Sequence, residues 1–304
     1  MKLHDYLEVF VPTHIVNANS EPYIENKMIE QTILSCHQTF DLKDVQFTIS
    51  PDARFKNSHA ALMVRYENYL NEMCTRLRLQ GINCIVKKEN GETLRGNWIK
   101  FVNECKKPYV LFLEHDWKFI REIDVNSVIA CLESTKEVNY IRLPKFNMTR
   151  NYYNSMCSAA NWDWVTAEAK DMNTGIPLTR ISFFSGNPHF ARVSFCRDFI
   201  VPALKKYCPL NKSKGASHLE KDIKKAEMYM IDELRDCGFS NQSTDQGKAW
   251  GHQWPLSSGP YVGKGCQQCA DAICKQHVIW GNFMYGQEGE KAIVSHLGDW
   301  CLKK

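Results

Sequence analysis

The chain has 304 residues, of which 44% are hydrophobic and 24% charged, and this composition excludes fibrous and low-complexity proteins. Its 38 basic and 34 acidic residues leave a net charge of +4, too weakly basic to predict a dedicated duplex-DNA binder but compatible with an anionic substrate. Because charges lie near the start and no long apolar run follows, we expect no secretory signal, no membrane span and a cytoplasmic protein with reduced cysteines.

The first third of the chain alternates between strand and helix patterns. Strands are predicted at 7–11, 45–49, 82–86 and 108–113, and helices at 24–40, 59–79 and 93–105. The last of these strands is continuously apolar, which is typical of a strand covered on both faces. We therefore expect an α/β fold with a mostly parallel central sheet flanked by helices, and ligands at the carboxyl ends of its strands.

The rest of the chain is less regular. Strands are predicted at 138–143, 181–184 and 190–193, and helices at 125–132, at 195–207 and from 217 to about 237. Residues 148–171 show no clear period and are expected to form a long loop. Residues 241–276 are turn-rich. We therefore expect the C-terminal region to be the less regular part of the fold.

Two acidic residues, Glu114 and Asp116, follow the buried strand directly. On an extended segment both carboxylates can reach the same point, and such oxygen ligands suit a hard divalent cation such as Mg²⁺ or Mn²⁺. Such an ion typically bridges carboxylates to the phosphates of a substrate. An isolated Glu-x-Asp is more often the solvated start of a loop, so the interpretation depends on the surrounding sequence.

The surrounding sequence, residues 93–117, resembles the helix, strand and Asp-x-Asp segment of glycosyltransferases with the A-type (GT-A) fold, especially those of family 2. In that family an Arg-Asn helix start precedes a strand whose Asp-x-Asp holds a metal under a sugar nucleotide. Here these positions are Arg95, Asn97 and the triplet Glu114-His115-Asp116, with Glu in place of the first Asp. The resemblance implies that Arg95 and Asn97 lie at the donor site; the alternative for Arg95 is a solvated helix residue.

The resemblance also implies a donor site built from later and earlier segments. It assigns Asp52 to the nucleotide base or ribose, and Pro12 and Thr13 to the same pocket. A small-residue loop under the donor sugar corresponds to Ser185-Gly186-Asn187, and a histidine that contacts the metal or the diphosphate corresponds to His296. Taken singly, Gly186 would be a turn glycine and His296 a structural histidine.

In this family an acidic motif that opens a helix supplies the general base. Here Glu220 is the first candidate for the base. Ser217 and Glu220 also form a capping box, and if Glu220 serves as the cap partner, Asp222 is the second candidate. The implied reaction moves a hexose or pentose from a nucleotide-diphosphate sugar, with UDP favoured, to an acceptor hydroxyl with inversion. We divide the chain into a nucleotide-sugar-binding half, 1–145, and an acceptor-side half with a C-terminal extension, 146–304, within one continuous domain.

A second group of metal-ligating side chains lies near the C-terminus: Cys266, Cys269, Cys274 and His277. Three thiols and one imidazole suit a structural, tetrahedral Zn²⁺, with Cys208, Cys237 and His252 as substitute ligands. Free buried thiols are the alternative, because the spacing matches no common zinc finger.

The acceptor is left open between a glycan or lipid-linked sugar, a protein side chain and a hydroxylated DNA base. Lysines cluster around the proposed base at 205, 206, 212, 214, 221, 224 and 225, and would contact phosphates of an acceptor such as DNA. Tryptophans that would stack on a sugar or base are Trp162, Trp164, Trp250 and Trp254. A solvated surface is the alternative for both groups.

Two other function classes stay open. A nucleotidyltransferase also uses metal-bound carboxylates, but it would carry a Gly-rich basic loop after the first strand, and residues 11–17 contain no glycine. A catalytically silent module that binds a nucleotide sugar or glycan would keep the fold, and donor hydrolysis would distinguish it. A dinucleotide enzyme is not favoured, because no Gly-x-Gly-x-x-Gly follows the first strand.

Overall fold

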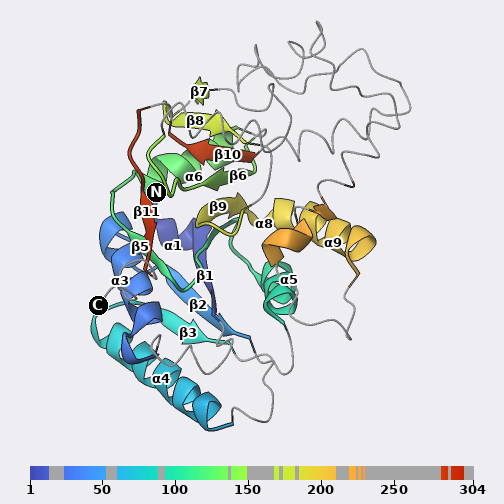
Figure 1. Ribbon diagram of the computed structural model, residues 1–304. Helices are drawn as coiled ribbons and strands as arrows, with labels where there is room; N and C mark the ends of the chain where they lie inside the picture. Colours follow the sequence, from blue (N-terminus) through green and yellow to red (C-terminus); the bar gives the residue numbers. More distant parts are fainter. Residues whose placement is uncertain are drawn as a thin grey trace, which may run out of the picture.

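The computed structural model describes residues 1–13, 24–52, 60–87, 93–135, 138–148, 168–170, 174–181, 185–209, 219–223, 225–226, 229, 282–286 and 289–297 (Figure 1). Several predicted residues lie outside these ranges: the zinc candidates Cys266, Cys269, Cys274 and His277 with the substitutes Cys237 and His252, the capping residue Ser217, the lysines 212, 214 and 224, and the four tryptophans named above.

The main sheet contains β1 (Leu7–Thr13), β2 (Gln46–Pro51), β3 (Cys84–Val86), β4 (Tyr109–Phe112), β6 (Tyr140–Arg142), β7 (Glu168–Lys170), β8 (Pro177–Arg180), β9 (His189–Arg192) and β10 (Asn282–Tyr285). Within the described residues the strand order is β3-β2-β1-β4-β9-β6-β10-β8-β7. The sheet therefore takes strands from both predicted halves of the chain.

Most strands of this sheet run in one direction. β3, β2, β1 and β4 pair in parallel, and so do β6 and β10. β9 lies between β4 and β6 and is antiparallel to both, and β8 is antiparallel to β10 and β7. This mostly parallel sheet with helices on both sides confirms the predicted α/β fold class.

Helices cover both faces of the sheet. α3 (Met28–Phe40), α4 (Ala60–Leu79) and α6 (Val125–Ser134) pack on one face. On the other face lie α5 (Leu94–Glu104) and a continuous helical stretch formed by α8 (Val193–Phe195), η3 (Cys196–Ile200) and α9 (Val201–Tyr207). Figure 1 shows α3 and α4 on one side of the strands and α5 and α9 on the other.

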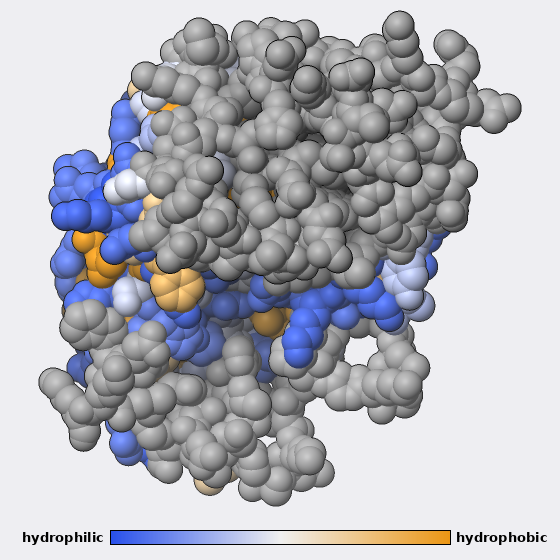
Figure 2. All heavy atoms as spheres, turned by 45° about the horizontal axis from the view of Figure 1, so that its top comes forward, coloured by the Kyte–Doolittle hydropathy of each residue, from blue (hydrophilic) through white to orange (hydrophobic). Residues whose placement is uncertain are grey.

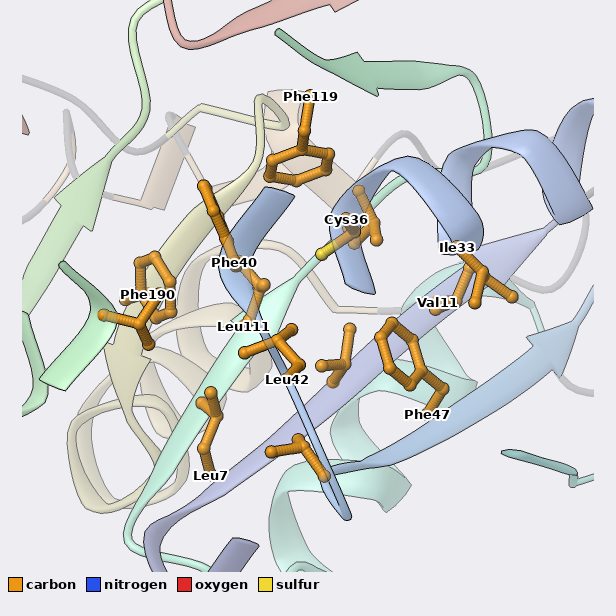
Figure 3. Close-up of a cluster of buried hydrophobic side chains, with 14 of the residues drawn as sticks. Leu7, Val11, Ile33, Cys36, Phe40, Leu42, Phe47, Leu111, Phe119 and Phe190 are labelled. Carbon is orange, nitrogen blue, oxygen red and sulfur yellow. The ribbon is translucent and has the colours of Figure 1, made fainter. Parts of the chain in front are cut away.

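The alternation of side chains along β1 explains how one strand contributes to two cores. Leu7 and Val11 point into the core under α3, where Figure 3 shows them among Ile33, Phe47 and Leu111. Phe10 points the other way and stacks on Phe101 of α5, with ring centroids 4.4 Å apart. Successive residues of a strand face opposite sides of the sheet, so an apolar run is buried on both.

The structure differs from the predicted elements mainly in strands of only three or four residues. β5 (Trp117–Phe119) and β11 (Val294–His296) form a separate antiparallel pair that the sequence pattern did not predict. β7 falls in the segment predicted as a loop, and β8 occupies 177–180 where a strand was predicted at 181–184. Strands of three or four residues are too short to show a period. A four-residue helix, α1 (Leu3–Tyr6), precedes β1.

Within the described ranges, no helix combines the length and apolarity needed to cross a membrane.

Candidate functional site

The carboxyl ends of β2, β1 and β4 bring the predicted residues Asp52, Thr13 and Glu114 to one edge of the sheet. The backbone N–H of Asp52 donates to the carbonyl of Thr13, at 2.7 Å, so the ends of β2 and β1 lie side by side. The N–H of Leu113, just before Glu114, donates to Phe10 of β1 at 2.9 Å. Pro12 pairs in register with Ser50 on the same edge. Parallel strands thus place the predicted nucleotide residues and the acidic triplet on neighbouring strands, about 4.8 Å apart.

Glu114 and Glu220 lie beside Gly186, and Asp116 lies close enough to Glu114 to affect its charge. A Cβ atom at Gly186 would lie 3.1 Å from Oε1 of Glu114 and 3.1 Å from Oε2 of Glu220. Burial, with smaller contributions from the negative charges of Asp116 and Glu220, raises the pKa of Glu114 to about 8. The structure therefore brings together three carboxylates that the sequence placed on two distant segments.

Gly186 contributes space to this cluster. Its φ is not in the left-handed region, where the glycines with positive φ in the described residues are Gly81, Gly175, Gly286 and Gly289. A side chain at 186 would crowd the two carboxylates beside it, whose ends would have to move by a few tenths of an ångström.

His296 contacts the second acid of the triplet. Its Nε2 lies 2.8 Å from Oδ2 of Asp116, and the N–H of Leu297 donates to the carbonyl of Asp116 at 2.6 Å. The pairing of β5 with β11 sets His296 opposite Trp117, whose ring it meets edge-on at 5.3 Å. The structure thus places His296 beside Asp116, as its predicted role requires, while metal binding by His296 stays a prediction.

Arg95 is buried and ion-paired. Its Nη1 donates to Oδ2 of Asp222 at 3.0 Å, and its Nη2 donates to the carbonyl of Leu204 at 3.0 Å. Arg95 is 2% exposed, so the alternative of a solvated helix residue is wrong. Asp222 is thus engaged by Arg95, whereas an oxygen of Glu220 lies beside Glu114 at Gly186, and the choice of Glu220 or Asp222 as the base stays a prediction.

α5 also fastens the end of β2. Thr93 caps the helix, its hydroxyl accepting from the N–H of Gly96 at 3.0 Å. Asn97, 2% exposed, donates through Nδ2 to the carbonyl of Pro51 at 2.9 Å, next to Asp52. In this structure Asn97 therefore fixes the backbone at the end of β2, next to Asp52. Direct contact of Asn97 with a donor stays a prediction.

The loop of Ser185, Gly186 and Asn187 is held by two side chains that sequence reasoning missed. The hydroxyl of Tyr140 bonds both the N–H and the carbonyl of Ser185, at 3.1 Å each. Nδ1 of His189 lies 2.8 Å from the carbonyl of Asn187, and the imidazole is stacked on Phe112, with burial lowering its pKa to about 3. No signal in the sequence singles out either residue, since both look like ordinary strand positions.

The oxygen ligands of the acidic residues are those that a hard cation prefers. Among the described residues, no group of three His, Cys, Asp or Glu side chains is arranged to hold a metal ion. Mg²⁺ is usually held by one or two carboxylates together with substrate phosphates. Glu114 and Asp116 provide such carboxylates, and the pKa of Glu114 is raised first by burial and then by the negative charges of Asp116 and Glu220, both of which a bound cation would offset. The side chains therefore fit an ion that binds together with a diphosphate. Cys208, a substitute in the zinc prediction, is a free buried thiol.

Comparison with known proteins yields distant structural likenesses. No family model and no curated protein matches the chain. S. aureus TarS 1–349 is matched with a TM-score of 0.37 at 16% identity, over 74% of this chain and 55% of that one. The same TarS fragment in complex with UDP-GlcNAc is matched with a TM-score of 0.33 at 16% identity, over 64% and 47%. A 4-diphosphocytidyl-2C-methyl-D-erythritol synthase from Anaerococcus prevotii is matched with a TM-score of 0.37 at 8% identity, over 75% and 83%.

The chain spans about half the length of the TarS structures it matches, 55% of one and 47% of the other. A functional assignment therefore has to come from the site itself. The candidate site consists of Glu114, with Asp116 and Glu220 near it, at the carboxyl edge of the mostly parallel sheet beside the predicted nucleotide residues.

Proposed function

We propose that the protein is a metal-dependent glycosyltransferase that moves a sugar from a nucleotide-diphosphate sugar, with UDP favoured, to an acceptor hydroxyl with inversion. The observation that supports this most is the approach of Glu114 and Glu220 at Gly186, with Asp116 close enough to Glu114 to raise its pKa. Two of these carboxylates suit a cation bound with a diphosphate, and the third suits a proton acceptor. The sequence resemblance to GT-A enzymes predicts the same division of roles.

The binding roles follow from the positions of the side chains. Asp116 and Glu114 would hold Mn²⁺ or Mg²⁺, which when bound supplies positive charge against the leaving diphosphate. His296 keeps one oxygen of Asp116 in a hydrogen bond and so fixes the orientation of that carboxylate. Asp52 and Thr13 lie on the neighbouring strands, where they would meet the nucleoside.

In the chemical step, the acceptor oxygen forms a bond to the anomeric carbon while the bond from that carbon to the diphosphate oxygen breaks. The diphosphate leaves with the bonding electrons, and the hydroxyl proton passes to the carboxylate of Glu220. Arg95 would position Glu220 indirectly, because it binds Asp222 on the helical segment that also carries Glu220. Attack from the face opposite the diphosphate gives an inverted product.

The test measures ligand-induced stabilisation and product formation together. Wild-type protein is screened against nucleoside diphosphates and nucleotide sugars with and without Mn²⁺, because a ligand that binds the native state raises the unfolding midpoint. Donor turnover is followed by release of the nucleoside diphosphate. We expect a metal-dependent shift with one nucleotide and slow hydrolysis of its sugar conjugate.

Three variants assign the roles. Asp116→Asn should lose the metal-dependent shift, Glu220→Gln should keep the shift and lose turnover, and Asp198→Asn, at an exposed acid paired with Arg197, should change neither. If no nucleotide stabilises the protein with metal, the proposal is wrong. If instead a nucleoside triphosphate and a sugar phosphate release pyrophosphate, the protein is a nucleotidyltransferase.

A further inference from the structure

An exposed basic face lies on the side of the molecule formed by α5, α9 and the helical segment at 219–223. We call it the lysine face, and it consists of Lys100, Lys205, Lys206, Lys221 and Lys225, all exposed. Figure 2 shows hydrophilic residues gathered on the side where Figure 1 places α9. This face contains the described members of the predicted lysine cluster.

Three of the described carboxylates near this face are paired with cations, and Glu220 on the same segment lies beside Glu114. Asp222 pairs with Arg95 at 3.0 Å, and Asp198 pairs with Arg197 at 2.9 Å. Glu104 lies 4.0 Å from Lys100 and 3.9 Å from Lys87, so one carboxylate faces two ammonium groups. The local balance is positive, and a polyanion is the complementary partner.

An aromatic pair lies within the lysine face. The rings of Tyr207 and Tyr229 are stacked, with centroids 5.7 Å apart and planes inclined by 15°. The ammonium of Lys206 lies 4.6 Å from the Tyr207 centroid, and that of Lys225 lies 5.6 Å from the Tyr229 centroid. Tyr229 is 43% exposed, an unusual exposure for a ring in a stack. Rings flanked by lysines are the combination that binds unpaired nucleobases and their phosphates.

A pocket opens between α5 and α9 beside these lysines. Its volume is about 630 Å³, with Gly96, Ile99 and Pro209 as apolar surface. Its polar lining is Asn103, the cations Arg95, Lys100 and Lys205, and the carboxylate of Glu104, which lies within 4.0 Å of Lys100. Pockets of a few hundred cubic ångströms accommodate ligands of nucleotide size. The apolar surface would cover a base, Asn103 would bond to its edge, and Lys205 would contact its phosphate.

We propose that the lysine face and this pocket bind a single-stranded nucleic acid. The lysines contact the phosphates, Tyr229 stacks on one base, and the pocket holds one base turned out of the strand. A single strand is required because a base in a duplex offers neither a free face for Tyr229 nor an edge for the pocket. Binding of the strand does not depend on the proposed sugar transfer; only the further identification of this strand as the sugar acceptor rests on it.

The binding test uses fluorescence anisotropy with a labelled deoxythymidine oligomer of about 12 nucleotides, within the usual site size of single-strand binders. The matching duplex and inorganic polyphosphate serve as competitors. We expect the single strand to bind, the duplex to compete weakly, and affinity to fall as salt rises. Equal competition by polyphosphate would identify the face as a general polyanion surface and would overturn the proposal, as would equal competition by the duplex.

Exposed variants separate charge from base recognition. The triple change of Lys205, Lys221 and Lys225 to Ala should weaken binding and lower the slope of log affinity against log salt by about 2, since each single-strand phosphate contact contributes about 0.7. The matched control is the triple change of the exposed Lys2, Lys43 and Lys106 to Ala, which should leave the affinity and the salt slope unchanged. Equal slopes in the two triple variants would overturn the assignment to the lysine face.

Two further variants test the base contacts. Tyr229→Ala should weaken binding of the single strand about tenfold, in the range of one lost base stack, without altering competition by polyphosphate. Asn103→Trp, at an exposed position that lines the pocket, should fill it and reduce binding similarly. Neither residue belongs to the proposed donor site, so Mn²⁺-dependent nucleotide shifts should stay as in the wild type. Loss of those shifts in the absence of any effect on strand binding would contradict the proposal.

Discussion

The buried ion pair between Arg95 and Asp222 should be one of the most sensitive points of the fold. The two side chains are 3% and 23% exposed, and they connect α5 to a segment more than a hundred residues later. Breaking a buried pair by removing one partner typically costs about 3–5 kcal/mol, because it leaves an uncompensated charge. The two partners differ in burial, so the two single substitutions should differ in cost.

Arg95→Met leaves the carboxylate of Asp222, which retains some contact with water, so we expect a loss of about 2–3 kcal/mol. Asp222→Asn leaves the nearly fully buried guanidinium, and we expect about 3–5 kcal/mol. The double variant should lose less than the sum of the two, because neither charge is then left alone. Urea unfolding followed by tryptophan fluorescence measures all three free energies of unfolding.

The matched control is Arg197→Met, which removes an Arg–Asp pair of similar length whose side chains are 42% and 64% exposed. Exposed pairs contribute about 0–1 kcal/mol, so this variant should unfold almost like the wild type. If Arg95→Met and Arg197→Met cost the same, burial does not determine the strength of these pairs. The claim that Arg95 holds the segment carrying Glu220 would then be refuted.

Four other substitutions test the surroundings of the site and two helix caps. Because burial lowers the pKa of His189 from 6.5 to about 3, its neutral form contributes stability that is complete above pH 6.5 and lost as pH falls towards 3. Thermal unfolding of His189→Phe should therefore depend less on pH between those values than unfolding of the wild type. Gly186→Ala should change stability by less than about 1 kcal/mol, since only carboxylate ends must move, yet weaken the metal-dependent nucleotide shift; an unchanged shift would contradict the crowding argument. Thr93→Ala should cost about 1 kcal/mol through loss of the cap on Gly96, as should Asp124→Ala at the start of α6, and chemical denaturation measures both.

The sequence predicts the first half of the fold well because its elements carry local signals. β1, β2 and β4 are apolar runs, and α4 shows an amphipathic period that ends before Gly81, which has a φ of 78°. The position of β9 between β4 and β6 has no such signal, because strand order depends on contacts between distant segments. Short strands such as β5 and β11 likewise show no periodic pattern in the sequence.

The same distinction applies to the candidate site. Glu114 and Asp116 were predicted from one short motif, and their position after a buried strand is a local property. The partner of Arg95 is an aspartate 127 positions away, and only the fold shows that this charge is used internally. Sequence reasoning therefore named the candidate side chains, and the structure shows that Asp222, one of the two candidate bases, is ion-paired with Arg95.

The proposed donor site and the lysine face meet at Arg95, and this gives a way to test them against each other. Arg95 lines the pocket between α5 and α9 and at the same time holds Asp222, on the segment that carries Glu220. Asp116→Asn should remove metal-dependent nucleotide binding and leave single-strand binding intact, while the lysine triple variant should do the reverse. Arg95→Lys keeps the charge but cannot bond both Asp222 and the Leu204 carbonyl in the same planar geometry. It should therefore weaken both activities in a protein that still folds. If Arg95→Lys affects neither, the two sites are not joined through this side chain.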